Sequence, residues 1–129
     1  MPMTAFKALM LAVRIAEQNN STLHMVCVEE VPSMPDSIEE IRETTAVSGR
    51  RYHQVLQRAR VIAEQHHVTI RPHVLAGHPV RAIIELSHQL SADLLVIGAT
   101  GHSALYERMV GSRADRIVQM APCPVLVVK

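Results

Sequence analysis

Helical and strand-like patterns alternate along the whole chain, and this alternation constrains the fold more than any other feature. Apolar residues recur at helical spacing in four segments, at residues 4–19, 37–67, 80–90 and from the end of a glycine motif to 120. Four apolar segments typical of strands follow these helices, at residues 22–31, 68–75, 92–99 and 121–129. Such alternation predicts an α/β fold, a doubly wound parallel sheet with right-handed crossovers. At 129 residues, we expect a single domain over residues 1–129.

The chain begins with a helix, although an amphipathic helix of this type normally follows a strand. Residues 1–3 read Met-Pro-Met, and the helical pattern already begins at Thr4. Residues 92–99 form the most apolar strand, which we expect at the centre of the sheet. Residues 68–75 include Pro72, which predicts a strand near an edge because proline cannot donate to an inner ladder. Because no strand-like segment precedes the helical pattern that begins at Thr4, the first strand is expected to be absent. We also expect the helix over residues 37–67 to loosen near Ser48 and Gly49.

Composition and charge exclude several classes of function. Aromatic residues make up only 2% of the chain, so the core must be aliphatic. The net charge is +1 and no basic cluster is interleaved with aromatics, which argues against nucleic-acid binding. No apolar run reaches membrane-spanning length, and no signal peptide precedes the first amphipathic pattern. Cys27 and Cys123 lie in apolar strand segments and are interpreted as buried free thiols in a reducing cytosol. The histidines share no ligand-like spacing, so no metal site is expected.

The stretch GATGHSALYERMVGS, residues 98–112, combines three glycines and a serine directly after a buried strand. Gly98, Gly101, Gly111 and Ser112 have the spacing G-x-x-G-(nine residues)-G-S, which is neither the Walker nor the G-x-G-x-x-G pattern. Glycines let the backbone approach a phosphate, and a helix N-terminus supplies N–H donors and positive potential. The alternative is purely structural: a turn, a helix break, and a capping box in which Ser112 pairs with Asp115. Spacing alone leaves both interpretations open.

Two residues in or beside this motif could contact a phosphate. His102 lies inside the motif, and Arg113 directly follows its serine. His78 is expected in another loop at the carboxyl end of a strand. For each of these side chains the alternative is exposure to water.

The segment ADLLVIGATGHSALYERMVGSRADRIVQMAPCPVLVVK, residues 92–129, resembles the C-terminal signature of the universal stress protein (UspA-like) family. GHPVRAII resembles the loop and third helix of that family, and STLHMVCVEEV resembles its second strand. The resemblance implies a Rossmann-like sheet with strand order 3-2-1-4-5. It also implies the family's ATP-binding branch, whose motif Gly98, Gly101, Gly111 and Ser112 match. Val28 falls where a family residue packs on adenine.

The resemblance implies a cytoplasmic stress-response switch or sensor that binds ATP, AMP or ADP, with which Mg²⁺ could bind. It also implies a homodimer formed through the last strand, Pro124 to Val128. No nucleophile, base and metal set points to an enzyme, although slow ATP hydrolysis or phosphotransfer is a weaker alternative. The rival hypothesis is a dimerising interaction module of the same fold that has lost its ligand.

The sequence departs from the family pattern at its start. Family members begin with a strand that ends in Asp and helps to hold the nucleotide, and residues 1–3 offer no such residue. That strand is central in the family order and forms one wall of the ligand crevice. Three arrangements are open: the flanking strands pair directly into a four-stranded sheet, a strand from another chain fills the gap, or further residues lie upstream. We exclude an arrangement in which the two strand edges beside the missing strand stay unpaired and shielded from water. Each buried unpaired backbone group would cost about 1–3 kcal/mol.

Overall fold

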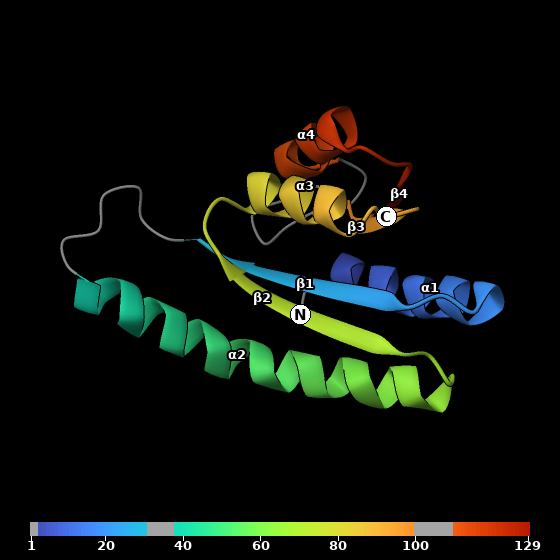
Figure 1. The fold of residues 1–129 in the computed structure, drawn as a ribbon, viewed down its shortest axis with the longest axis horizontal. Helices are drawn as coiled ribbons and strands as arrows, with labels where there is room; N and C mark the ends of the chain where they lie inside the picture. Colours follow the sequence, from blue (N-terminus) through green and yellow to red (C-terminus); the bar gives the residue numbers. More distant parts are fainter. Residues whose placement is uncertain (1–2, 31–37, 100–109) are drawn as a thin grey trace.

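The computed structural model describes residues 3–30, 38–99 and 110–129, with the backbone alone for residues 38–51. The described residues form alternating helices and strands (Figure 1), in the order α1 (Met3–Asn19), β1 (Leu23–Glu29), α2 (Ile38–Gln65), β2 (Ile70–Ala76), α3 (Pro79–Gln89), β3 (Leu95–Gly98), α4 (Ser112–Met120) and β4 (Val125–Val128). Each predicted segment overlaps one of these elements. The expected loosening near Ser48 and Gly49 is wrong, because α2 is one continuous helix. A single interior glycine costs only about 1 kcal/mol, too little to interrupt a helix of this length.

The strands form two separate parallel sheets rather than one. β1 pairs with β2 from Leu23 opposite Ile70 onward, and β3 pairs with β4 from Leu95 opposite Val125 onward. The parallel pairing and the edge position of β2 are confirmed. The direct pairing of the strands that flank the missing one is wrong, because within the described residues no ladder joins β1 to β3.

Helix α1 connects the two sheets. It contacts β1 as well as β3 and β4, and α3 likewise packs on both sheets, so among the described residues helices and not a central strand join the sheets. Consequently β3, which we expected at the centre of a sheet, has β4 as its one strand neighbour among the described residues. All residues of β3, and all of β1 except Cys27, are half-buried rather than buried. The alternatives that invoke another chain or upstream residues stay predictions.

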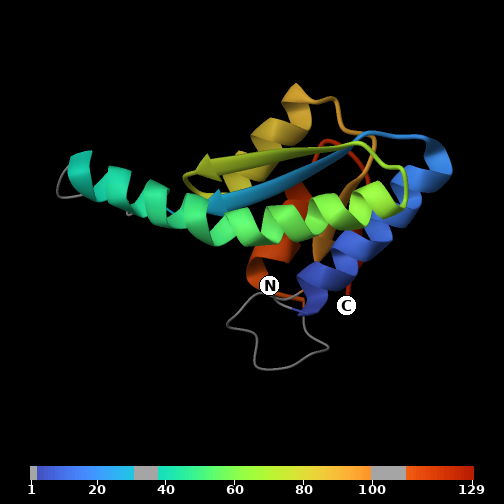
Figure 2. The ribbon, with the colours of Figure 1, turned by 90° about the horizontal axis from the view of Figure 1, so that it is seen from below.

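Two aliphatic clusters form the core, one for each sheet. The first lies between α1, α2 and the β1–β2 sheet and contains Leu9, Val13, Ala16, Ala59, Ala63 and Val68. The second lies between α3, α4 and the β3–β4 sheet and contains Val80, Ile84 and Ile117. Figure 2 shows α2 running along the β1–β2 sheet, with α3 on the opposite side of these strands. The expectation of an aliphatic core is confirmed, since all these cluster residues are aliphatic.

Two histidines contact one another between β1 and β2, and β1 carries a buried cysteine. The Nδ1 atom of His24 is 2.9 Å from Nε2 of His73, and the two rings stack. Burial, with smaller effects from His73 and Arg71, lowers the pKa of His24, so His24 favours its neutral state. Cys27 is buried, as predicted, and burial raises the pKa of its thiol, whereas Cys123 is half-buried.

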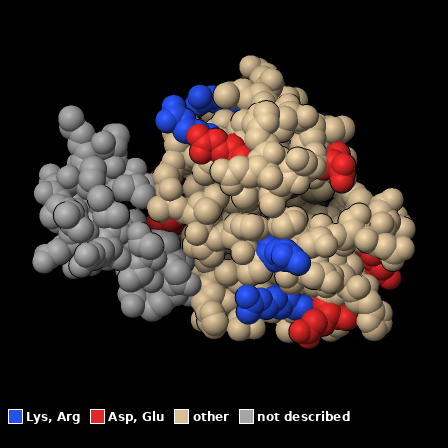
Figure 3. Space-filling model, viewed as in Figure 1, with Lys and Arg blue, Asp and Glu red and all other residues tan. Residues whose placement is uncertain are grey.

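The surface in Figure 3 mixes charges of both signs. Lys and Arg side chains lie near Asp and Glu side chains on this face, and neither sign forms a continuous patch there. Within the described ranges, no helix has both the length and the apolar character needed to cross a lipid bilayer.

Candidate functional site

The end of β3 and the start of α4 are held together by backbone hydrogen bonds. The N–H of Gly111 donates to the carbonyl of Ala99 at 2.7 Å, and the N–H of Ala99 donates to the carbonyl of Val128 at 2.8 Å. Ala99 is 1% exposed, so this connection lies in the protein interior. The structure therefore brings Gly98 and Gly111, the two described glycines of the motif, to the same edge of the β3–β4 sheet.

Helix α4 begins one residue earlier than the capping-box prediction requires. Gly111 is the N-cap residue, with φ −65° and ψ 157°, and Ser112 is the first helical residue. The N–H of Asp115 donates to the carbonyl of Gly111 at 3.0 Å, and the Asp115 carboxylate accepts instead from Gln119 at 3.0 Å. The predicted capping box of Ser112 with Asp115 is therefore wrong, because a capping side chain must project from the residue with extended backbone.

The glycine cap leaves the start of α4 without an acceptor from its own N-cap side chain. The first N–H groups of any helix lack intrahelical partners and carry partial positive charge. Ser112 adds a hydroxyl and Arg113 a guanidinium in the first turn of α4. The start of α4 thus combines backbone donors, a hydroxyl and a cation.

Position 98 requires a glycine because α1 packs closely against it. A Cβ atom at this position would come within 2.9 Å of Thr4 Oγ1 and 3.1 Å of the Ala5 backbone nitrogen. Real Cβ contacts are essentially never shorter than 3.0 Å. The close approach of the first turn of α1 therefore accounts for glycine here.

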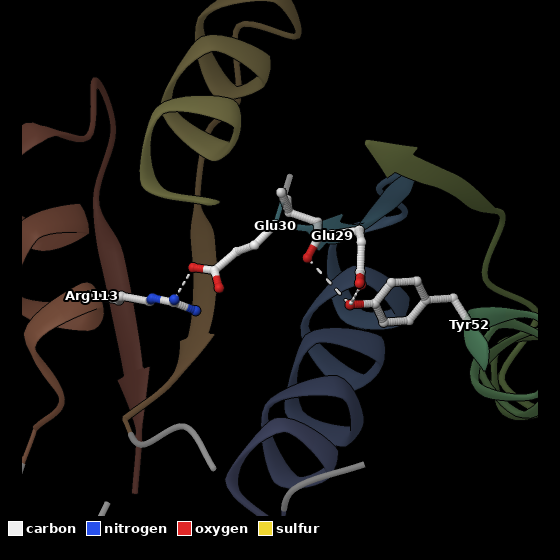
Figure 4. Close-up of polar contacts among 5 residues, drawn as sticks. Glu29, Glu30, Tyr52 and Arg113 are labelled. Atoms are coloured by element: carbon white, nitrogen blue, oxygen red, sulfur yellow. Dashed lines mark hydrogen bonds and ion pairs between the residues drawn. The ribbon is translucent and has the colours of Figure 1, made fainter. Parts of the chain in front are cut away.

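Arg113 forms an ion pair that links the two sheets. Its Nη2 atom donates to Oε1 of Glu30, which directly follows β1. Figure 4 shows the two side chains pointing toward one another, Arg113 from α4 and Glu30 from the end of the other sheet. Both side chains are more than half exposed, at 61% for Arg113 and 59% for Glu30. Arg113 therefore has a partner in addition to its contact with water.

Tyr52 of α2 holds the carboxyl end of β1. Its hydroxyl lies 3.2 Å from the carbonyl oxygen of Val28 and 3.4 Å from Oε2 of Glu29, and its single hydrogen is shared between them. Both contacts are visible in Figure 4. Val28 itself is half-buried and pairs with Leu75 of β2. The segment from Val28 to Glu30 is thus fixed from α2 on one side and contacted by α4 on the other.

Four of the predicted site residues lie in one place, at the end of β3 and the start of α4. Gly98, Gly111, Ser112 and Arg113 lie together, and Val28 is connected to them through Glu30 and its ion pair. Gly101 and His102 lie outside the described residues. His78 is elsewhere, at the N-cap of α3, where it lines a groove of about 380 Å³ with Arg81 and Arg116.

Sequence reasoning missed Glu30 and Tyr52. Glu30 could have been found, because it follows a strand at the edge where doubly wound sheets bind ligands. Tyr52 gave no such signal, since it lies within a long helix and reaches β1 only in the folded chain. Among the described residues, no group of three or more His, Cys, Asp and Glu could hold a metal ion.

Parallel strands joined by helices, with the glycine-capped helix α4 following β3, define a protein of the doubly wound α/β class. The model of the universal stress protein family matches residues 2–129, and the chain belongs to that family. It is 33% identical over 123 residues to a universal stress protein of Methanocaldococcus jannaschii, covering 92% of this chain and 71% of that protein.

Solved structures have the same fold. The universal stress protein UspA of Lactobacillus plantarum superposes with a TM-score of 0.82 at 24% identity, covering 98% of this chain and 90% of that one. A universal stress protein in complex with cAMP gives a TM-score of 0.73 at 23% identity, over 98% of this chain and 88% of that one. The Archaeoglobus fulgidus protein in complex with dAMP gives 0.65 at 20% identity, over 100% and 90% of the two chains.

Proposed function

We propose that this protein binds an adenine nucleotide between the end of β1 and the start of α4. The phosphate lies at the N-terminus of α4, beside Ser112 and Arg113, and the adenine packs on Val28. The observation that carries this proposal is the glycine N-cap of α4, which leaves the first-turn N–H groups without a side-chain cap next to an arginine. Helix N-termini of this kind stabilise anions.

Family membership supports the proposal. Two related universal stress proteins have been solved with nucleotides of the AMP type, one with cAMP and one with dAMP. We extend the proposal to ATP, with ADP and AMP as alternatives and Mg²⁺ bound with the nucleotide. In this extension Gly98, Gly101, His102 and Gly111 line the phosphate chain, as the resemblance of the motif implies.

We further propose that the protein acts as a cytoplasmic switch or sensor and not as a fast enzyme. Four described ionisable side chains at the site contact one another, since Arg113 binds Glu30 and Tyr52 binds Glu29, while Asp115 in the first turn of α4 accepts a hydrogen bond from Gln119. None of these four groups lies as a free base beside a nucleophile, which general acid–base catalysis requires. Slow ATP hydrolysis stays a weaker alternative.

The second candidate function is a dimerising module without a ligand. It is favoured by β4, which pairs with β3 on one edge and has no other strand neighbour among the described residues. A short apolar strand with a free edge is suited to pairing with a second copy. Dimerisation through residues 124–128 is compatible with either function.

Calorimetric titration tests the nucleotide proposal. We expect AMP to bind about 10- to 100-fold more tightly than adenosine, because a charged hydrogen-bond network to phosphate contributes roughly 1.5–3 kcal/mol. ATP with Mg²⁺, cAMP and inorganic phosphate complete the series. The absence of heat and of any thermal shift with all adenine nucleotides at millimolar concentration would contradict the proposal. A dimer that still forms in that case would favour the second candidate.

A further inference from the structure

The ion pair between Arg113 and Glu30 joins two parts of the protein that share no strand ladder. The partners are 83 residues apart in sequence, one following β1 and the other in the first turn of α4. Glu30 thereby places a carboxylate against the cation that stands at the start of α4 (Figure 4). This is the position that the proposed function gives to a phosphate.

The exposure of the pair indicates an exchangeable contact. With side chains 61% and 59% exposed, it is hydrated and screened by salt, and such pairs contribute little to stability. A phosphate group can accept two parallel hydrogen bonds from a guanidinium and carries more negative charge than a carboxylate. A phosphate is therefore a stronger partner for Arg113 than Glu30 is.

We infer that Glu30 is an internal competitor for Arg113: its carboxylate holds the guanidinium in the free protein and must be exchanged for the nucleotide phosphate on binding. This inference rests on the proposed function. Breaking the Arg113–Glu30 ion pair offsets part of the free energy that the phosphate gains by contacting Arg113. Glu30 therefore lowers the affinity for the nucleotide. It acts only on ligands that carry a phosphate and leaves adenosine unaffected.

The test compares Glu30→Gln with Glu64→Gln by calorimetric titration of AMP and adenosine into the full chain. Glu64→Gln is the control, because it removes the same charge from an exposed residue of α2 that lies outside the proposed site. We expect Glu30→Gln to tighten AMP binding by about 3- to 10-fold and to leave adenosine binding unchanged. Glu64→Gln should change either affinity by less than about 2-fold, and the gain of Glu30→Gln should shrink at high salt.

The outcomes separate this inference from the proposed function. If the wild-type protein and both variants fail to bind AMP, the proposed function and the inference fall together. If the wild type binds AMP but Glu30→Gln leaves its affinity unchanged or weakens it, the inference is overturned and the proposed function stands. Equal tightening of AMP and adenosine would also overturn it, because Glu30 would then act on the nucleoside. Thermal unfolding of each variant shows whether it is folded before titration.

Discussion

Replacing Gly111 with aspartate weakens AMP binding by about 10- to 100-fold without lowering stability. An aspartate at the N-cap of α4 accepts hydrogen bonds from the first-turn N–H groups and places a negative charge beside them. It therefore occupies the donors that the phosphate requires and also repels that phosphate. The fold change corresponds to about 1.4–2.7 kcal/mol, the range of a charge-assisted hydrogen bond. Titration of AMP into the variant measures the loss.

Stability and affinity should move in different directions in this variant. Aspartate is a better N-cap than glycine by a few tenths of a kcal/mol, so its urea midpoint should equal or exceed that of the wild type. Gln18→Glu is the control, because it adds one negative charge at an exposed residue of α1 and should change AMP affinity by less than about 2-fold. A stable Gly111→Asp protein that binds AMP as tightly as the wild type would show that the phosphate lies elsewhere.

Replacing Gly98 with valine lowers the free energy of unfolding by about 1–3 kcal/mol, the usual cost of overpacking. The new Cβ would lie 2.9 Å from Thr4 Oγ1 and 3.1 Å from the carbonyl carbon of Thr4, so the first turn of α1 must move. Backbone atoms of a helix cannot rotate away as the end of a side chain can. Urea denaturation followed by circular dichroism measures the change.

Gly111→Ala is the matched control for this substitution. The φ of Gly111 is −65°, which alanine adopts readily, so only the weaker capping of alanine should be felt, at less than about 1 kcal/mol. An unchanged stability of Gly98→Val would contradict the packing of α1 on β3. A Gly98 variant that loses affinity for the nucleotide can therefore do so because α1 has moved, and not only because a contact with the phosphate is lost.

Local patterns predicted the elements of this fold well. Two observed helices correspond to the helical spacing in residues 4–19 and 80–90, and two observed strands correspond to the apolar runs around Cys27 and Ile97. These patterns arise because each element buries one side against a neighbour. The parallel pairing followed from their alternation. The family resemblance added the nucleotide hypothesis, which the residues alone left open.

Features that depend on the packing of distant segments could not be predicted. The steric reason for Gly98 is a helix more than 90 residues earlier in the chain, and the partner of Arg113 is 83 residues away. The N-cap was displaced by one residue because glycine and serine both occur at caps and only the backbone dihedral angles decide between them. The contacts of α1 with both sheets also join segments that are far apart in the sequence, and no local pattern encodes them.

The location of the bound nucleotide is the central claim, and amide chemical shifts measured during an AMP titration test it most directly. We predict the largest shifts for Ser112, Arg113 and Ala114 in the first turn of α4, and for Val28 to Glu30 at the end of β1. Adenosine should shift the β1 residues and leave the first turn of α4 nearly unchanged. Shifts confined to the groove between α3 and α4, around His78 and Arg116, or no shifts at saturating AMP, would contradict this account.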